Sequence, residues 1–270
     1  MTTDPPEPKA RRKWHFYKWL VLLIVATSAY AAWNAYLFRS ALKEAKALGW
    51  DVTYTDPYAQ IRADWKAAFK KQTWLEGVSV VIITTGEELE KHPAIVRRLN
   101  PKALSVFNSD ALHDFSAIKS LNRLEILSIM RGSSLANIDE LKNLTALEKI
   151  YLPDCTKITN VDALQKLSAL KRVLLPGCTA LTNVDAFKNL LTLKEIVLDD
   201  CKGLTNMDAL KHLSKLEVLS LADCTGLTNV NALKGLTALQ EIDLRNCTGL
   251  TKESIAALKA ALPKTKIYAN

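Results

Sequence analysis

Apolar residues between Leu124 and Leu250 recur at a fixed interval of 23 residues. Counted from one reference residue in each interval, called position zero here, they stand at −8, −5, −3, +3, +6, +9 and +12. One interval cannot bury its own apolar side chains, so successive intervals must stack on one another. The pattern therefore predicts a solenoid whose coils share one core. Position zero is cysteine in five consecutive coils: Cys155, Cys178, Cys201, Cys224 and Cys247.

Two spacings within each coil predict its local structure. The residues at −5 and −3 are two apart, which predicts a short strand with both side chains inward. The residues from +3 onward are three apart, which predicts a 3₁₀ or irregular return on the opposite, convex side. Neighbouring strands then form a curved parallel sheet with a spacing of roughly 4.8 Å. Continued upstream, the interval predicts eight strands, centred on Ile82, Ser105, Ser128, Tyr151, Leu174, Val197, Ser220 and Asp243.

The order of Leu147, Ile150, Leu152 and Cys155 resembles the leucine-rich-repeat family, whose core reads L-x-x-L-x-L-x-x-N/C-x-L. The resemblance is to the bacterial type, with 23-residue repeats that contain cysteine, and it covers residues 78–270. It implies an α/β leucine-rich-repeat solenoid of about eight coils. It also implies that the residue at position zero points inward and bonds the backbone of the turn.

Three roles compete for the registered cysteines. A buried structural ladder is favoured because a free cysteine behaves as a small, readily buried hydrophobic residue. Disulfides between neighbouring coils are disfavoured, since ladder side chains point the same way rather than at each other. A metal site is least favoured because the sequence has no C-x-x-C pair and no histidine in register with the ladder.

The N-terminal part of the chain carries a membrane signal. Trp19–Phe38 is a run of 20 residues without a charge, which as a helix spans one bilayer core of about 30 Å. Five Lys or Arg residues precede it, so the positive-inside rule places residues 1–18 in the cytoplasm and exports the repeats. The alternative is a cleaved signal peptide ending at Ala29-Tyr30-Ala31. The apolar run continues past that site, which favours an uncleaved anchor.

The segments that flank the repeats predict caps for the open ends of the core. Residues 39–77 form a helical juxtamembrane segment: Arg39–Leu48 ends at Gly49, and an amphipathic helix around Trp65 follows Asp56-Pro57. That second helix caps the solenoid, lies on the membrane surface or pairs with a partner's helix. Within the repeats (78–251), one helix is expected over Glu87–Leu99. Residues 252–270 predict a C-terminal cap, with a helix before Pro263 and a last strand over Thr265–Tyr268.

Composition and motifs argue against catalysis and against nucleic acid. The net charge of +8 is spread along the chain, and no Lys/Arg run with an aromatic platform indicates a nucleic-acid partner. The four histidines share no repeat position, and no nucleophile, phosphate-loop or metal motif occurs. We therefore expect no enzyme, no cofactor and no metal.

Outward residues on the strands vary between coils much more than the returns do, which is typical of a recognition surface on a fixed scaffold. An apolar strip runs through the first and middle coils, and an acidic patch follows toward the C-terminus. The residues expected to bind a partner on this concave face are Phe107, Met130, Arg131, Tyr151, Asp154, Leu174, Val197, Asp199, Asp200, Ser220, Asp223, Asp243 and Arg245.

These features together predict a membrane-anchored scaffold that binds another protein. The chain would be a single-pass protein of the cytoplasmic (inner) membrane, held through residues 19–38, with its repeats in the periplasm or outside the cell. Two alternatives remain open: a secreted internalin-like adhesin or effector released by cleavage after Ala31, and an accessory regulator of a membrane enzyme complex.

Overall fold

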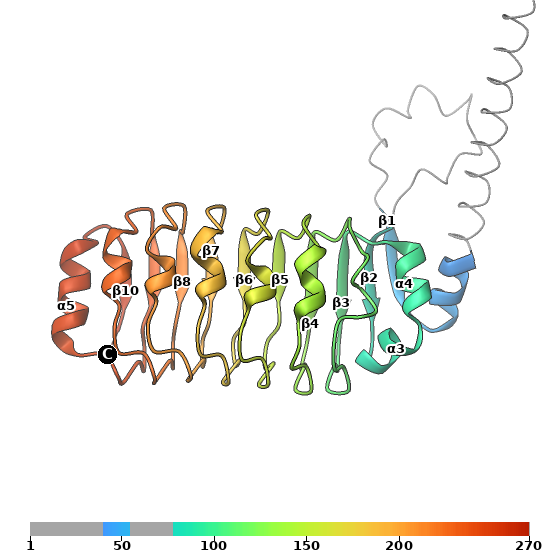
Figure 1. Ribbon diagram of the computed structural model, residues 1–270, viewed down its shortest axis with the longest axis horizontal. Coiled ribbons are helices and arrows are strands. Elements are labelled where there is room, and N and C mark those ends of the chain that lie inside the picture. The colour runs from blue at the N-terminus through green and yellow to red at the C-terminus, as the bar shows by residue number, and fades with distance from the viewer. Residues whose placement is uncertain (1–39, 55–77, 270) are drawn as a thin grey trace, which may run out of the picture.

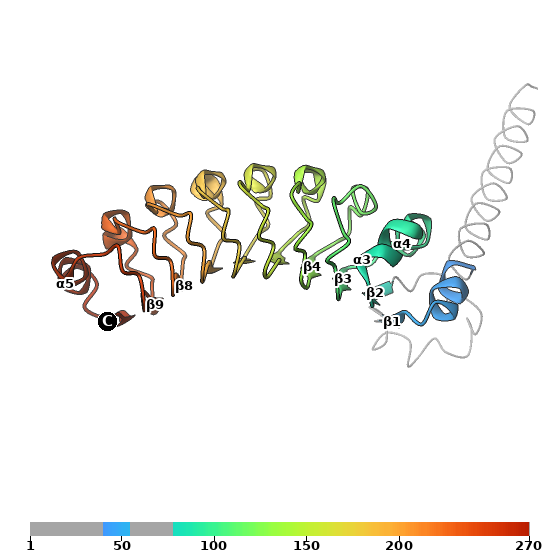
Figure 2. The same cartoon turned by 90° about the horizontal axis from the view of Figure 1, so that it is seen from below.

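Ten strands form one sheet in which every strand pairs with its neighbours in the sequence. The computed structural model describes residues 40–54 and 78–269, and their coils stack side by side in a row (Figure 1). Seen from below, the row curves into an arc (Figure 2). The strands lie on the inner side of the arc and the returns on its outer side, so the sheet is the concave face (Figure 2). The strands are β1 Asp51–Tyr54, β2 Val78–Ile83, β3 Ala103–Val106, β4 Ile126–Ile129, β5 Lys149–Tyr151, β6 Arg172–Leu174, β7 Glu195–Val197, β8 Val218–Ser220, β9 Glu241–Asp243 and β10 Lys266–Tyr268.

The register of the sheet confirms the 23-residue ladder. Strands β2 to β9 are parallel, and the eight predicted centres pair with one another in order, from Ile82 with Ser105 to Ser220 with Asp243. Tyr268 of β10 then pairs with Asp243, as the predicted last strand requires. Because a slip of one residue would turn every inward leucine to solvent, the repeat pattern fixes this register.

In the core, side chains at the same repeat position of successive coils stack on one another in columns. Residues at −5 and −3, such as Ile150 and Leu152, are buried, and so are the apolar residues at +3 to +12 of the returns except Leu250. Burying one such side chain contributes roughly 1.5–3 kcal/mol, and each coil covers its neighbour's leucines. The described residues of the repeats therefore share one hydrophobic core along the whole arc.

The convex returns are 3₁₀ helices, as the three-residue spacing predicts. Each begins with a side-chain bond across the turn: the amide oxygens of Asn160 and Asn183 accept from the backbone N–H of Asp162 and Asp185, both at 3.2 Å. The same bond occurs at Asn137, Asn206 and Asn229, so this column has a structural role. The 3₁₀ helices are η2 Asp139–Asn143, η3 Asp162–Leu164, η4 Asp185–Asn189, η5 Asp208–Leu210 and η6 Asn231–Gly235.

Residues 40–54 cover the N-terminal end of the solenoid. Residues 40–47 are helical, and the helix ends at Gly49 in the left-handed conformation with a φ of 74°, as predicted. Strand β1 then pairs antiparallel with β2, an element that the sequence analysis did not predict. Trp50 is buried in this cap, and its indole Nε1 donates to the Glu88 carboxylate at 2.6 Å.

The first coil contains two helices where the sequence analysis expected one. Helix α3 spans Gly86–Lys91 and α4 spans Pro93–Leu99. The expectation of one helix over Glu87–Leu99 was wrong because Pro93 lacks an N–H and cannot continue α3. His92 leaves helical geometry between them, with φ −123° and ψ 44°, and Pro93 starts α4 at a position that tolerates proline.

Helix α5 and strand β10 cover the C-terminal end. Helix α5 spans Lys252–Ala261, and the Thr251 side chain caps it by accepting from Ser254 N–H at 3.2 Å. Leu258 and Leu262 are buried against the last repeat. The C-terminal helix and strand therefore lie where the sequence analysis placed them.

The predicted basic tail (1–18), membrane segment (19–38) and amphipathic helix around Trp65 lie outside the described residues. None of the helices within residues 40–54 and 78–269 has the length and apolar character to span a bilayer. The membrane anchor and the role of the Trp65 helix therefore stay predictions.

Candidate functional site: the concave face

Outward residues at −4 stand at the centre of each strand on the concave face. Tyr151, Leu174 and Val197 are half-buried there, flanked on each strand by fully buried inward neighbours. The predicted residues Ser220 and Asp243 occupy the same column and are also half-buried. The strand alternation therefore places this column in one line along the inside of the arc.

The apolar strip has a hollow at its N-terminal end. Phe107 is 43% exposed, Met130 and Tyr151 are half-buried, and Pro153 is buried. The Oγ of Ser128 lies 3.8 Å from the sulfur of Met130, which helps to hold that side chain on the face. The hollow has a volume of about 330 Å³, and it is lined by Phe107, Asn108, Met130, Arg131, Tyr151, Pro153 and Asp154.

The structure thus brings five of the predicted partner-binding residues together around this hollow: Phe107, Met130, Arg131, Tyr151 and Asp154. Leu174 and Val197 lie on the next strands, β6 and β7, and do not line it. The strip is continuous in register, and the hollow lies over its first three coils.

Residues at −1 occupy a turn with an unusual backbone. All seven residues that follow strands β3 to β9 at this position have positive φ, between 45° and 75°. Only glycine adopts this conformation without cost, and Asn and Asp tolerate it better than other residues. Six of the seven are Asn, Asp or Gly, and the exception is Arg131, with a φ of 59°; the column is Asn108, Arg131, Asp154, Gly177, Asp200, Asp223 and Asn246.

This backbone changes the interpretation of Asp154 and of part of the predicted acidic patch. Asp154, Asp200 and Asp223 have φ values of 58°, 58° and 62°, so a left-handed turn is sufficient reason for their residue type. The carboxylate of Asp200 also pairs with Lys202 at 3.1 Å, and Asp223 accepts from the Asn246 amide at 2.9 Å. Negative charge in this column therefore does not by itself indicate recognition.

The other two acidic residues of the patch also have partners on the protein. The Asp199 carboxylate accepts from Ser220 Oγ at 2.6 Å and from Ala222 N–H at 3.0 Å. Asp243 binds the Arg245 guanidinium through both of its oxygens, and this bond lowers the pKa of the Asp243 carboxyl. In the described part of the chain, no group of three His, Cys, Asp or Glu side chains is arranged to hold a metal ion.

The cysteine ladder lies beneath this face and is structural. All five cysteines are buried free thiols. Four of them donate to the backbone carbonyl of the preceding coil, and the Sγ of Cys155 lies 3.7 Å from the Pro153 carbonyl of its own turn. These Sγ–O distances are 3.5 Å for Cys178 to Leu152, 3.3 Å for Cys201 to Leu175, and 3.0 Å for Cys224 to Leu198 and Cys247 to Leu221.

Burial sets the chemistry of these thiols. It raises the pKa of Cys178 and Cys224 to about 12 and that of Cys247 to about 11, while a backbone N–H in the preceding coil lowers each pKa by a smaller amount. A thiolate is the reactive form of cysteine, and almost none is present near neutral pH at such values. The ladder therefore holds neighbouring coils together without offering a nucleophile.

The partner-binding residues predicted from the sequence did not include the outward position at −6, which is the first residue of each strand. Ile126 is 40% exposed there, and Arg172 pairs with Glu195 at 3.2 Å. Period-two alternation continues from −4 to −6, which is the signal that could have found this column. The column comprises Ala103, Ile126, Lys149, Arg172, Glu195, Val218 and Glu241.

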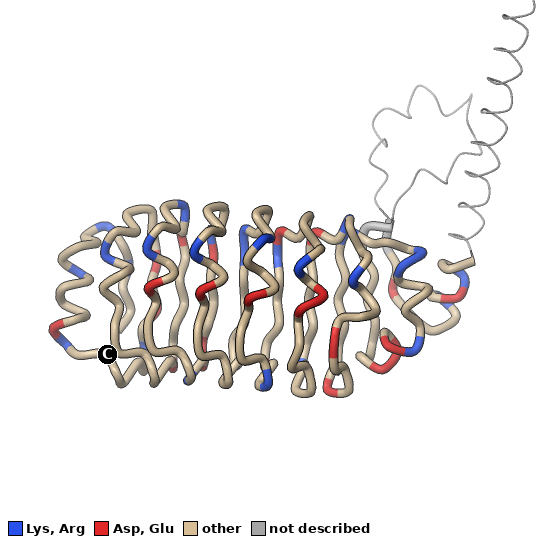
Figure 3. The backbone as a smooth tube through the Cα atoms, viewed as in Figure 1, with Lys and Arg blue, Asp and Glu red and all other residues tan. Residues whose placement is uncertain are grey.

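The convex face carries charge in regular rows (Figure 3). Asp162 and Asp185 stand at the first residue of their 3₁₀ helices, and Lys142, Lys188 and Lys234 stand in the last turn of theirs. These signs complement the helix dipole. Because the same charges recur from coil to coil, the convex face offers little to distinguish one partner from another.

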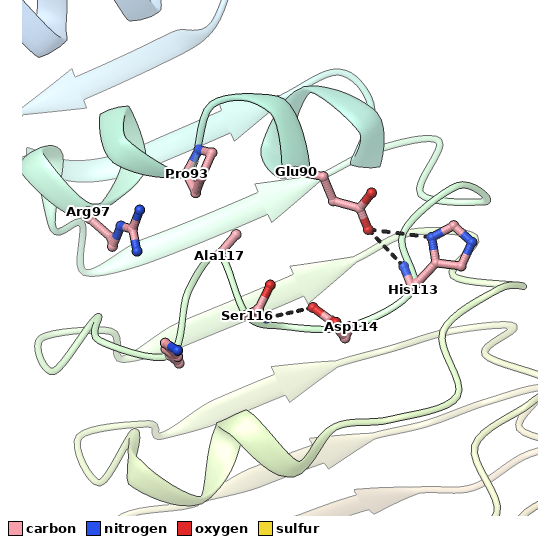
Figure 4. A pocket seen from close by; sticks show the side chains of 8 residues that line it. Glu90, Pro93, Arg97, His113, Asp114, Ser116 and Ala117 are labelled. Atoms are coloured by element: carbon pink, nitrogen blue, oxygen red, sulfur yellow. Dashed lines mark hydrogen bonds and ion pairs between the residues drawn. The ribbon is translucent and has the colours of Figure 1, made fainter.

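A second hollow, of about 510 Å³, lies beside α3 and α4 (Figure 4). The Glu90 carboxylate there accepts from the backbone N–H of His113 at 3.0 Å, and the Asp114 carboxylate accepts from that of Ser116 at 2.8 Å. The bond from Ser116 lowers the pKa of Asp114. The imidazole of His113 is largely exposed, with its Nδ1 3.6 Å from Glu90. Both carboxylates hold the backbone of a return, so we assign this hollow a structural role.

Short parallel strands, 3₁₀ returns and a thiol ladder define a solenoid repeat protein. Residues 128–251 match the family model described as the BspA type leucine rich repeat region, in six copies. Residues 128–251 therefore form a leucine-rich-repeat region, in agreement with the predicted resemblance.

Solved structures show the same fold. Internalin C2 from Listeria monocytogenes is 19% identical with a TM-score of 0.56, and the match covers 80% of this chain and 94% of that one. The leucine-rich-repeat domain of the type III effector XCV3220 (XopL) is 19% identical with a TM-score of 0.57, and the match covers 100% of this chain and 97% of that one. No curated protein sequence matches the chain.

Proposed function

We propose that this protein is a scaffold that binds another protein through its concave face. The observation that carries the proposal is the contrast between the inside and the outside of the sheet. Inward positions are uniformly apolar and buried, whereas the outward positions differ from coil to coil and include the hollow between Phe107 and Tyr151. Variable side chains held on a fixed sheet are what a recognition surface requires.

The proposed mechanism is rigid display. Each coil is fixed by its leucines and by the strand ladder, and five coils also by a buried thiol, so the outward side chains are ordered before a partner arrives. Binding then costs little conformational entropy, which favours affinity for a given contact area. Outward residues that already have partners within the sheet, such as Asp243 with Arg245, would present fixed patterns of charge.

We further propose that residues 19–38 anchor the chain in the cytoplasmic membrane and that the repeats lie on the exported side. The support is the uncharged 20-residue run behind five basic residues. The alternatives are secretion after cleavage at Ala31 and a role as accessory regulator of a membrane enzyme complex. N-terminal sequencing of the mature protein separates cleavage from anchoring: a start at Met1 supports the anchor, and a start at Ala32 supports secretion.

Site-specific photo-crosslinking in intact cells tests the binding face. A photoreactive residue replaces Tyr151, Val197 or Asp243 on the concave face, and Lys211 on the convex face serves as the control. A discrete adduct from the concave positions and none from Lys211 is the expected result. If Lys211 gives the same adduct, or if the concave positions give none, the concave face is not the binding surface.

A further inference from the structure

We propose that the hollow around Arg131 is an anchor point for a partner segment that carries a carboxylate beside an apolar side chain. The apolar wall would receive the side chain, and the guanidinium of Arg131 would bind the carboxylate. This inference rests on the proposed protein-binding role of the concave face and specifies the chemistry of its partner.

The backbone of Arg131 is strained. Its φ of 59° places an ordinary L-residue in the left-handed region, where six equivalent turns use Asn, Asp or Gly. That conformation is unfavourable for any residue with a Cβ, because the Cβ then lies too close to the following carbonyl oxygen. The turn geometry explains the other six residue types and does not explain an arginine. Local strain of this kind concentrates at functional sites.

The side chain of Arg131 lies at the rim of an apolar recess. Arg131 is exposed and lines the hollow together with Phe107, Met130 and Tyr151. These three side chains give the hollow an apolar wall that remains partly exposed to solvent. A guanidinium at the rim of an apolar recess matches a ligand with an apolar body and a carboxylate, because its planar fork can bind both carboxylate oxygens.

Two other cationic side chains of the concave face are already paired. Lys202 and Arg245, farther along the same face, are paired with Asp200 and Asp243. Among the described residues, no ion pair joins Arg131 to a carboxylate, although Asp154 lines the same hollow. The guanidinium of Arg131 is thus the cationic group of this hollow that the rest of the described sheet leaves available.

A competing explanation is that Arg131 pairs with Asp154 in solution and has only a structural role. The variants R131N and D154N separate the two. Both substitutions place Asn, which tolerates a positive φ, at a −1 position, so both preserve the turn. If Arg131 and Asp154 form an internal ion pair, both variants should change the binding of a carboxylate ligand alike. If Arg131 binds the ligand, only R131N should weaken that binding.

The hollow contains its own reporter for the experiment. The chain has three methionines, of which Met130 lines the hollow and Met207 is fully buried in the core. The full-length chain, kept in a zwitterionic detergent, is labelled with ¹³C at the methionine methyl groups. N-acetyl-phenylalanine, which carries a carboxylate, and its neutral amide are then titrated separately. The M130L variant assigns the Met130 signal.

The expected result is a saturable shift of the Met130 methyl signal with the carboxylate, while Met207 stays in place. The amide should bind about fivefold more weakly, and R131N should abolish that difference while D154N preserves it. Three results would overturn the inference: no shift of Met130 with either compound, equal affinity for both, or a preference for the carboxylate that survives in R131N.

Photo-crosslinking of the same variant distinguishes failure of this inference from failure of the proposed function. Adducts from Val197 and Asp243 that persist in R131N, together with equal affinity for acid and amide, would reject the anchor and keep the concave face as the binding surface. Absence of adducts from every concave position would reject both.

Discussion

The sulfur of Cys155 occupies the space that a side chain on Gly132 would need. A Cβ added to Gly132 would lie 2.8 Å from Cys155 Sγ, closer than atoms of this kind approach one another. Gly132 and Cys155 are successive residues at position zero, so the first cysteine of the ladder packs against the last coil that lacks one. The two residue types therefore depend on each other.

The variant G132A should destabilise the protein through this contact. Overpacking of a buried site costs about 1–3 kcal/mol, partly offset by about 0.4–1 kcal/mol from the less flexible unfolded chain. Urea unfolding of G132A, C155A and the double variant measures the coupling. In the C155A background the sulfur is gone, so G132A should cost little. An equal cost of G132A in both backgrounds would contradict the packing argument.

The buried thiols should resist alkylation in the folded protein. Iodoacetamide reacts with thiolates, and burial raises the pKa of Cys178 and Cys224 to about 12. Mass spectrometry should find all five unmodified in native protein and all five modified in denaturant. Cys247 should react first on partial opening, since it is 6% exposed and its pKa is raised only to about 11. Rapid native labelling of Cys201 or Cys224 would show that the ladder is not structural.

The same pKa values predict a loss of stability at alkaline pH. The thiol of Cys178 has a pKa of about 12 when folded and an ordinary value of about 9 when unfolded. Above pH 9 the unfolded chain releases this proton and the folded chain keeps it, so the free energy of unfolding falls as pH rises. Urea titrations from pH 8 upward should show this decline. In C178A the slope should be shallower, because one such thiol is missing.

Much of this fold is predictable because the interval of 23 residues is unbroken. It fixed all eight strand centres, from Ile82 to Asp243, and the convex 3₁₀ returns. Elements that lie outside the 23-residue repeat were harder to predict from the sequence. Strand β1 (Asp51–Tyr54) is four residues long and has no counterpart in the repeat, and the break at Pro93 was missed inside a stretch of helical composition.

The candidate site was harder to predict, because the same residue type can be favoured either by the backbone conformation or by contact with a partner. Asp154, Asp200 and Asp223 belonged to the predicted partner-binding surface, yet their positive φ is sufficient to explain them. The sequence did contain a signal, since Asn, Asp or Gly fills six of seven −1 positions. Arg131 became distinctive only once the backbone of that column was known.

The variant R131N should be more stable than the wild-type protein. Asn tolerates the left-handed conformation that costs Arg131 free energy, so a gain of about 0.5–1 kcal/mol is expected. D154A serves as the opposite test, because Ala lacks the local bonding that lets Asp adopt a φ of 58°, and it should lose a similar amount. Thermal unfolding measures both. A lower stability of R131N would mean that the arginine makes a stabilising contact in the folded protein.

The last prediction concerns Trp50, which couples the N-terminal cap to the first coil. Its ring is buried and meets His92 edge-on at 6.3 Å between centroids, while its Nε1 donates to Glu88. Truncating a buried tryptophan costs about 3–5 kcal/mol. In a solenoid each coil contacts only its neighbours, so the loss of stability in W50A should be confined to the N-terminal coils.

Hydrogen exchange resolved by mass spectrometry checks this locality. Peptides from β2 and β3 should lose protection in W50A, whereas those from β8 and β9 should keep it. The control W50F retains a six-membered ring but removes the bond to Glu88 and part of the buried ring volume, so it should cost less than W50A. A uniform loss of protection along all the strands would show that the repeats unfold as one cooperative unit and that the cap stabilises the whole arc.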